Sequence, residues 1–190
     1  MLDYDAEATT YDETRGGTAR AETAASAVAA LLAPGPVLDV GGGTGLVALG
    51  LARRGVDIVV LDRSSGMLAL ASERLPGRAL RADATRLPVG DGVLGGVLLM
   101  WLLHLLDDAG PVLAEAARVL WPGGVLVTSV DKAAAHGWRD ADPTDAERTV
   151  VAQAATRGLA VSGHGSYIGH GQGRDGGPDP VFPLLALHRR

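Results

Sequence analysis

The stretch Val37-Leu38-Asp39-Val40-Gly41-Gly42-Gly43-Thr44-Gly45 decides the fold of this chain. Its first four residues predict a short buried strand, its glycines predict a sharp turn, and Leu46 opens a segment with helical character. Glycines between a strand and a helix let the backbone approach a ligand closely, but they also occur where the helix only packs against the strand. The stretch therefore predicts the start of an α/β fold and a candidate ligand loop.

Segments with strand and helix character alternate along the rest of the chain. We expect helices over residues 18–33, 46–54, 65–75, 107–120 and 142–157, and strands over residues 37–40, 56–62, 78–82, 93–100 and 124–130. Residues 159–168 and 181–188 are expected to form a closing hairpin. This order indicates a doubly wound α/β sheet of about seven strands, mostly parallel with an antiparallel last strand, and with helices on both faces.

The charge and composition of the chain argue against several classes of protein. The 190 residues carry a formal net charge of −5 and no run of Lys or Arg, which argues against a nucleic-acid partner. The absence of cysteine excludes disulfides, thiolate metal sites and cysteine nucleophiles, and it fits a reducing compartment. Residues 1–17 lack the pattern of a signal peptide, and the apolar run 93–106 is shorter than the roughly 20 residues of a membrane span. We therefore expect a cytoplasmic protein without membrane contacts.

Two residues distinguish the glycine loop from a dinucleotide-binding loop. The pattern G-x-G-x-x-G requires glycine at position 46, where this chain has Leu46, and it serves a pyrophosphate at the helix N-terminus. Asp39 precedes Gly41 by two residues, and its carboxylate would repel a pyrophosphate but favour an ammonium or sulfonium group. S-adenosyl-L-methionine (SAM) carries both cations, so the loop favours SAM over a dinucleotide.

Two further carboxylates follow the second and third expected strands. Asp62 is placed to accept both hydroxyls of a ribose, and its alternative role is an N-cap, which Ser64 or Ser65 could equally supply. Asp83 could accept a hydrogen bond from an adenine amino group, or it could form an Asx turn. Three acids at three successive strand ends indicate one ligand site, because parallel strands share the edge at which open α/β sheets bind ligands.

Several motifs together resemble those of class I SAM-dependent methyltransferases. They are VLDVGGGTG, the strand end at Asp62, ADATRLPVGDG, WLLHLL and RVLWPGGVLV. The likeness covers residues 11–130. More narrowly, the chain resembles the small-molecule, ubiquinone-biosynthesis-like group, and its segment YDETRGG resembles the N-terminal lid of that group. It implies a Rossmann-like fold, SAM as cofactor with S-adenosyl-L-homocysteine as product, and one domain over residues 1–190. Within it, residues 1–33 would form a lid and helix, 34–130 the cofactor-binding core, and 131–190 substrate-side loops with the closing hairpin.

The resemblance also implies roles for individual residues. Asp39 and the loop glycines would frame the methionine part, Asp62 the ribose, and Asp83 with the Ala84 amide the adenine. The backbone carbonyl of Met100 would accept a hydrogen bond from the amino group of the methionine part. Tyr11 and Arg15 would close over the methionine end, unless they are ordinary surface residues. The cofactor-binding residues expected in full are Tyr11, Arg15, Asp39, Gly41, Gly43, Gly45, Asp62, Arg63, Met67, Asp83, Ala84 and Met100.

The chain departs from the family pattern at two places. Members usually carry an aromatic residue before the fourth strand, where this chain has Val93-Leu94-Gly95-Gly96. The segment after the fifth strand, residues 131–142, is short where members commonly have an insertion over the substrate pocket. A shallow pocket, or one completed by a second copy or a partner protein, is therefore compatible with the sequence.

The residues that would serve the acceptor are less well defined. His104 follows the fourth strand and is the candidate general base, with a structural histidine beside Trp101 as the alternative. The candidate substrate contacts are Trp101, His136, Trp138 and Tyr167, although His136 and Trp138 also fit a surface loop with a packed tryptophan. No metal is expected, because His164 and His170 lack a third ligand.

The sequence thus predicts methyl transfer from SAM to an oxygen, nitrogen or carbon nucleophile of a small organic molecule by in-line displacement. Two alternatives stay open. The first is a protein of the same fold that does not methylate, either a cyclase-type enzyme or a subunit that needs a partner. The second is a nicotinamide-dependent oxidoreductase, against which Asp39, Leu46 and the missing Tyr-x-x-x-Lys motif argue.

Overall fold

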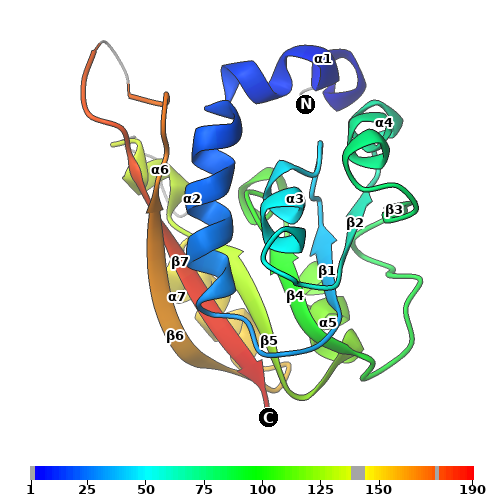
Figure 1. The fold of residues 1–190 in the computed structure, drawn as a ribbon. Coiled ribbons are helices and arrows are strands. Elements are labelled where there is room, and N and C mark those ends of the chain that lie inside the picture. Colours follow the sequence, from blue (N-terminus) through cyan, green and yellow to red (C-terminus); the bar gives the residue numbers. More distant parts are fainter. Residues whose placement is uncertain (1–2, 138–143, 174–175) are drawn as a thin grey trace.

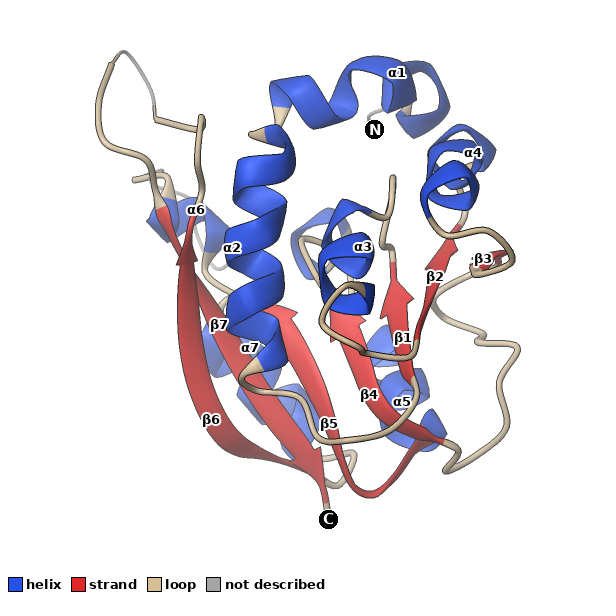
Figure 2. Ribbon diagram, viewed as in Figure 1, coloured by secondary structure: helices blue, strands red, loops and turns tan. Residues whose placement is uncertain are grey.

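The computed structural model describes residues 3–137, 144–173 and 176–190 of the chain. Strands and helices alternate through the first part of the chain and build three layers, with the sheet in the middle (Figures 1 and 2). The strands are β1 Val37–Val40, β2 Ile58–Asp62, β3 Ala79–Arg81, β4 Leu94–Leu99, β5 Leu120–Ser129, β6 Leu159–Ile168 and β7 Val181–Arg189. The helices are α1 Tyr4–Thr14, α2 Gly17–Ala29, α3 Leu46–Ala52, α4 Ser65–Arg74, α5 Gly110–Val119, α6 Lys132–Ala135 and α7 Glu147–Ala155, with a 3-10 turn at Leu103–Leu105.

The seven strands form one sheet in the order β3-β2-β1-β4-β5-β7-β6. Strands β1 to β5 pair in parallel, whereas β7 runs antiparallel to both β5 and β6. The predicted fold class, a doubly wound sheet with an antiparallel last strand, is confirmed. The chain order reverses between β1 and β4, and at such a point the loops on either side of the strands diverge and leave room for a ligand.

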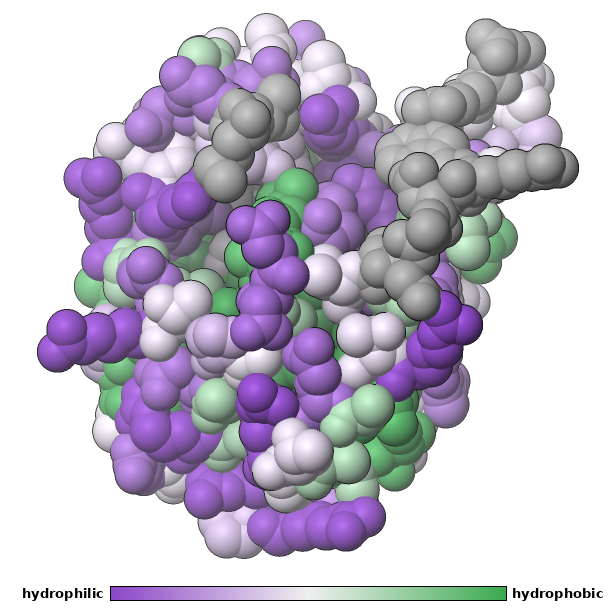
Figure 3. Space-filling model, turned by 180° about the vertical axis from the view of Figure 1, so that it is seen from behind, coloured by the Kyte–Doolittle hydropathy of each residue, from purple (hydrophilic) through white to green (hydrophobic). Residues whose placement is uncertain are grey.

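Each face of the sheet carries its own hydrophobic core. Helices α2, α3 and α4 cover one face, and α5 and α7 cover the other (Figure 1). The face seen from behind in Figure 3 is largely hydrophilic, and its hydrophobic side chains show in small separate patches. No helix in the described ranges has the length and apolar character needed to cross a membrane.

The glycines of β4 are explained by a close approach of the backbone. A Cβ atom on Gly95 would lie 2.6 Å from the carbonyl oxygen of Pro34 and 2.8 Å from Cζ2 of Trp121. A Cβ on Gly96 would lie 2.9 Å from Cδ2 of Leu32. The turn that joins α2 to β1, together with Trp121, therefore occupies the space beside the strand that larger side chains would need.

Three elements differ from the sequence prediction. Helix α1 was not predicted, because only Ala8 on it is buried and its sequence lacks an apolar face. Helix α7 begins at Glu147, whose backbone N–H donates to Oδ1 of Asp131 at 3.2 Å, and the first residues of the expected helix lie outside the described ranges. The four-residue helix α6 is too short to leave a periodic pattern.

Candidate functional site

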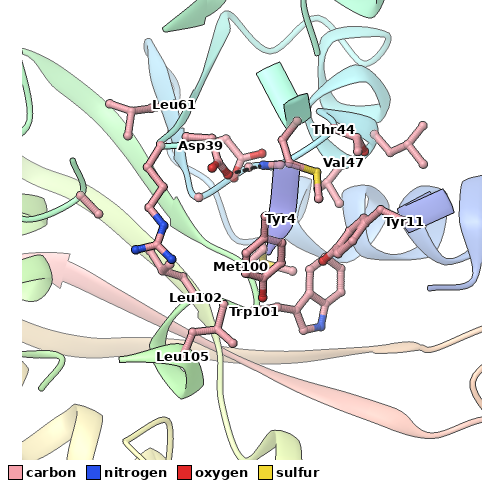
Figure 4. Close-up of a pocket in the computed structure, with 18 of the residues that line it drawn as sticks. Tyr4, Tyr11, Asp39, Thr44, Val47, Leu61, Met100, Trp101, Leu102 and Leu105 are labelled. Atoms are coloured by element: carbon pink, nitrogen blue, oxygen red, sulfur yellow. Dashed lines mark hydrogen bonds between the residues drawn. The ribbon is translucent and has the colours of Figure 1, made fainter. Parts of the chain in front are cut away.

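A cavity of about 460 Å³ opens at the carboxyl ends of β1, β2 and β4, at the point where the strand order reverses. The glycine loop, the ends of β2 and β4, and the turn after β3 contribute to its walls, and α1 and α2 close it from the N-terminal side. Figure 4 shows Tyr4 and Tyr11 of α1 facing Met100 and Trp101 across this space. The predicted site residues that line this cavity are Tyr11, Asp39, Gly41, Gly43, Asp62, Arg63, Met67, Asp83, Ala84, Met100 and Trp101.

Asp62 is held rigidly at the end of β2. Its Oδ2 accepts the backbone N–H of Gly43 at 2.9 Å, and its Oδ1 accepts that of Ser64 at 2.9 Å. Helix α4 is capped by Ser64, whose Oγ accepts the N–H of Met67 at 3.1 Å. Because a carboxylate offers about four acceptor positions, Asp62 can still accept two hydroxyl groups from a ligand.

Asp39 is a buried carboxylate in the middle of the sheet. Its side chain is 1% exposed, and Oδ1 has no hydrogen-bond partner among the described residues. Burial, and then the nearby charge of Asp62, raise the pKa of Asp39 to about 7. An unpaired carboxylate is costly to bury, so a cation bound in the cavity would compensate for it.

Asp83 lines the cavity from the turn after β3. Its Oδ1 accepts both the N–H and the Oγ1–H of Thr85 at 2.7 Å, so the Asx turn that sequence offered as the alternative is present. These two hydrogen bonds lower the pKa of Asp83, which keeps it ionised. The turn also orients the Asp83 and Ala84 backbone toward the cavity that both residues line.

Helix α1 is held over the cavity by two polar attachments. Asp12 accepts hydrogen bonds from Thr44 Oγ1 in the glycine loop and from Arg74 of α4, both at 2.6 Å. Asp5 accepts the Ser64 hydroxyl at 2.6 Å and the N–H of Gly66 at 2.7 Å, at the start of α4. The segment that resembles a family lid is thus fastened across the site in this structure.

Two of the predicted cofactor residues lie outside the lining of the cavity. Gly45 turns away from it, because a Cβ there would lie 3.2 Å from Cβ of Ala71 on α4. The guanidinium of Arg15 lies 5.7 Å from the ring centroid of Tyr11, so it contacts a residue of the cavity wall from outside. Gly42, which sequence analysis left out, lines the cavity instead.

Among the predicted acceptor residues that the structure describes, Trp101 alone lines the cavity. Tyr167 is 4% exposed and lies behind Trp101, with its ring edge-on at 5.6 Å. The ring of His136 packs on Phe182 at 5.2 Å. Trp138 lies outside the described residues. The antiparallel hairpin therefore supports the wall that Trp101 forms.

His104 lies next to the cavity wall and bonds with the chain's one lysine. The distance between Lys132 Nζ and His104 Nε2 is 2.7 Å. Burial, and then the charge of Lys132, lower the pKa of His104 to about 4, so its ring is neutral at pH 7. Burial and the charges of Arg15 and Arg20 lower the pKa of Lys132 to about 8. At pH 7 the ammonium therefore donates to Nε2, and the ring proton resides on Nδ1.

Arg20 lines the cavity and was missed by sequence analysis. Its side chain is 9% exposed, and its Cζ lies 4.2 Å from the ring centroid of Trp101. The sequence contained a signal for this position. Ala24 and Val28 follow Arg20 by four and eight residues, which places all three on the buried face of α2. An arginine at such a position is a candidate for a ligand contact.

Trp101 itself has a strained backbone. Its φ angle is 52°, in a region that bulky residues rarely adopt, and its N–H donates to Ser129 Oγ at 2.7 Å. Strain of this kind is maintained where the surrounding structure requires a side chain in one direction. Here it directs the indole into the cavity wall.

Comparisons with known proteins agree with this geometry. A family described as a methyltransferase domain matches residues 38–128. A demethylmenaquinone methyltransferase of Parafrankia sp. is 34% identical over 191 aligned positions, which cover 87% of this chain and 74% of the relative. The corresponding enzyme of Beutenbergia cavernae is 44% identical over 94 residues, 49% of this chain and 39% of that relative, so the match spans about two-fifths of its length.

Solved structures share the fold at low sequence identity. A chain in a Haloferax volcanii complex, formed by the Trm112 methyltransferase activator and a methyltransferase, superimposes with a TM-score of 0.77 at 20% identity. The superposition covers 100% of this chain and 99% of that one. Together with the relative that this chain covers over most of its length, the family match shows that the chain belongs to the class I SAM-dependent methyltransferases.

Proposed function

We propose that the protein transfers a methyl group from SAM to a nucleophilic atom of a small organic molecule. The observation that carries this proposal is the buried carboxylate of Asp39, which has an oxygen without a partner beside the glycine loop. A dinucleotide would bring a pyrophosphate to this position, and the two negative charges would repel each other. A ligand with an ammonium and a sulfonium would instead be attracted.

The residues around the cavity fit SAM along its whole length. Asp39 would bind the ammonium group, Asp62 the ribose hydroxyls, and Asp83 with the Ala84 amide the adenine. The backbone carbonyl of Met100, at the end of β4, would accept a hydrogen bond from the same ammonium group. When bound, SAM supplies a methyl group that is activated by the positive sulfur.

The protein's own residues orient the acceptor and exclude water. Trp101, Leu102 and Leu105 contribute apolar side chains to the cavity wall (Figure 4), where they would exclude water from the reaction. Helix α1, fastened by Asp5 and Asp12, covers the opposite side. Such alignment of reacting atoms can supply about 7–11 kcal/mol of the barrier reduction. To act as the candidate base, His104 would have to release its Nε2 from Lys132, whose Nζ lies 2.7 Å away.

We further propose that the acceptor is a small molecule and that the protein works in the cytoplasm. Nucleic acid and membranes are not expected partners. The short segment after β5 keeps open a homo-oligomer or a partner protein that completes the pocket. A protein of this fold that binds SAM without transferring the methyl group remains the second candidate, because His104, His136 and Tyr167 lie outside the cavity lining.

The loop glycine Gly42 gives a specific test of the SAM site. A Cβ atom there would lie 2.6 Å from Asp39 Oδ2 and 3.0 Å from Val60 Cγ1, so Gly42→Ala must displace the carboxylate. We expect binding of S-adenosylhomocysteine to weaken about tenfold, the cost of one impaired hydrogen bond to a charged group. Calorimetric titration of the variant and of the wild type measures this change in affinity. Gly90→Ala is the matched control, because its nearest neighbour would be Val93 Cγ1 at 3.7 Å.

The activity itself is tested by incubating the purified protein with SAM labelled in its methyl group and a panel of acceptors. Mass spectrometry should detect S-adenosylhomocysteine and a labelled product in equal amounts. The panel is run with and without candidate partner proteins, and NADH binding is titrated in parallel. SAM that binds but is never consumed would favour the second candidate, and binding of NADH alone would favour an oxidoreductase.

A further inference from the structure

The cavity carries opposite charges at its two ends. Asp39 and Asp62 lie at the glycine loop, whereas Arg20 lies at the Trp101 end (Figure 4 shows Asp39 and Trp101 apart). Burial, and then the charge of Arg15 among other groups, lower the pKa of both Arg20 and Lys132, so these three cations lie within electrostatic range of one another. Among the described residues, no carboxylate forms an ion pair with Arg20. A cationic cofactor suits the first end, and the second end has an excess of positive charge.

Three buried polar atoms gather at this cationic end, and none of them has a carboxylate or carbonyl partner among the described residues. They are Nε of Arg20, Nε1 of Trp101 and the hydroxyl oxygen of Tyr167. The Arg20 guanidinium stacks on Trp101 at 4.2 Å, and Trp101 contacts Tyr167 edge-on at 5.6 Å, so the three groups form one cluster. The Trp101 N–H and the Tyr167 hydroxyl are placed to bond to each other, which leaves Nε of Arg20 as the buried donor without a partner. Buried polar groups in native proteins nearly always have partners, so this arginine on the cavity wall indicates a ligand.

The chemistry of the cluster selects the ligand. The guanidinium and the indole can only donate hydrogen bonds, and the tyrosine hydroxyl can donate as well. The guanidinium is also permanently charged and is 9% exposed, so its attraction for an anion is weakly screened. An ionised oxygen is therefore the complementary group, and an ammonium or a neutral amine is not.

We propose that Arg20, stacked on Trp101, binds an ionised oxygen of the acceptor, so that the acceptor belongs to the phenols, enols or similar acids. This inference rests on the proposed methyl-transfer function. The acceptor releases its proton to solvent on binding. Transfer to that oxygen then forms the O–C bond and breaks the C–S bond, whose electron pair returns to sulfur, and no proton remains to be removed.

The test uses 4-nitrophenol, whose ionised form absorbs visible light, with the full chain saturated by S-adenosylhomocysteine. We expect bound probe to ionise about one pH unit lower than free probe, which equals about a tenfold preference for the phenolate. Its methyl ether, 4-nitroanisole, has no ionisable oxygen and should bind at least about tenfold more weakly at a pH where the probe is ionised. An unshifted ionisation in the wild type would overturn the proposal.

Variants test whether the pKa shift of bound 4-nitrophenol depends on Arg20 and Trp101. Arg20→Met keeps a long side chain against Trp101 and should abolish the shift, whereas Arg53→Met, at an arginine with a 61% exposed side chain, should retain it. Trp101→Phe keeps a ring but removes the indole N–H, and should reduce the shift in part. If Arg20→Met does not fold, Arg20→Lys and Trp101→Phe still test the proposal. An unchanged shift in the pKa of bound 4-nitrophenol in both variants would contradict it.

The carboxylate of the cofactor is the other source of an ionised oxygen, and a binding comparison separates the two. Arg20→Met should bind S-adenosylhomocysteine and 5′-methylthioadenosine, which lacks the amino-acid part, as the wild type does. Weakened binding of the first alone would assign Arg20 to the cofactor and overturn this inference, while the proposed function would stand. A wild-type protein that binds neither compound would overturn the proposed function instead.

Discussion

Asp62→Ala should weaken the binding of S-adenosylhomocysteine by at least about 100-fold. The change removes the acceptor for the predicted ribose hydroxyls and leaves the N–H groups of Gly43 and Ser64 without their carboxylate partners. Hydrogen bonds to a charged group contribute about 1.5–3 kcal/mol each, so the loss of two predicts roughly 3–6 kcal/mol. Calorimetric titration of the purified variant measures the change in Kd.

The matched control for Asp62→Ala is Asp57→Ala. Asp57 lies just before the same strand, but its side chain is 67% exposed and pairs with Arg78 on the surface. We expect this variant to bind as the wild type does, since exposed ion pairs contribute little. An Asp62→Ala protein that folds, by its circular dichroism and melting curve, and still binds within about threefold of the wild type would refute the ribose assignment.

Asp39→Asn should have opposite effects on binding and on stability. The variant cannot form an ion pair with the ammonium group of the ligand, so affinity for S-adenosylhomocysteine should fall by about 10- to 100-fold at pH 8. The same change removes a buried negative charge, whose oxygen Oδ1 has no partner in the described residues. The unliganded variant should therefore melt at a higher temperature than the wild type at this pH.

The pH dependence follows from the sign of the Asp39 shift. The pKa is raised from 3.8 to about 7, so the folded protein binds more protons than the unfolded chain between these values. The free energy of unfolding therefore falls as the pH rises through this window, by up to about 4 kcal/mol. Asp39→Asn should remove that fall, and melting curves at pH 5 and pH 8 measure it.

Ligand affinity should change with pH in the opposite sense. Acidification below about pH 7 protonates Asp39 in the wild type, so binding of S-adenosylhomocysteine should weaken there, and it should not in Asp39→Asn. Asp91→Asn is the control, because the side chain of Asp91 is 78% exposed and lies at the far end of β4. An Asp39→Asn variant that is less stable at pH 8 and binds normally would contradict both predictions.

The sequence by itself determined the elements that rest on strong local patterns. Strand β1 was predicted with its observed bounds, Val37–Val40, because an apolar run between Pro36 and Gly41 can be little else. The start of α3 at Leu46 and the position of Asp62 at the end of β2 follow from similar short-range signals. Alternation of such elements, together with the rule that parallel strands place their carboxyl ends at one edge, predicted that Asp39, Asp62 and Asp83 lie together, and all three line the cavity.

The tertiary structure alone decided which polar groups surround that site. Arg20 belongs to a helix far in sequence from Trp101, and His104 meets Lys132 from a different strand end. Local sequence patterns do not predict such contacts, because the contacts depend on the packing of α2 and of the closing hairpin against the sheet. Sequence therefore located the end of the cavity that the glycine loop and the acids form, because these residues lie close to their strands. The positive charge at the Trp101 end of the cavity arises only when distant segments are buried together.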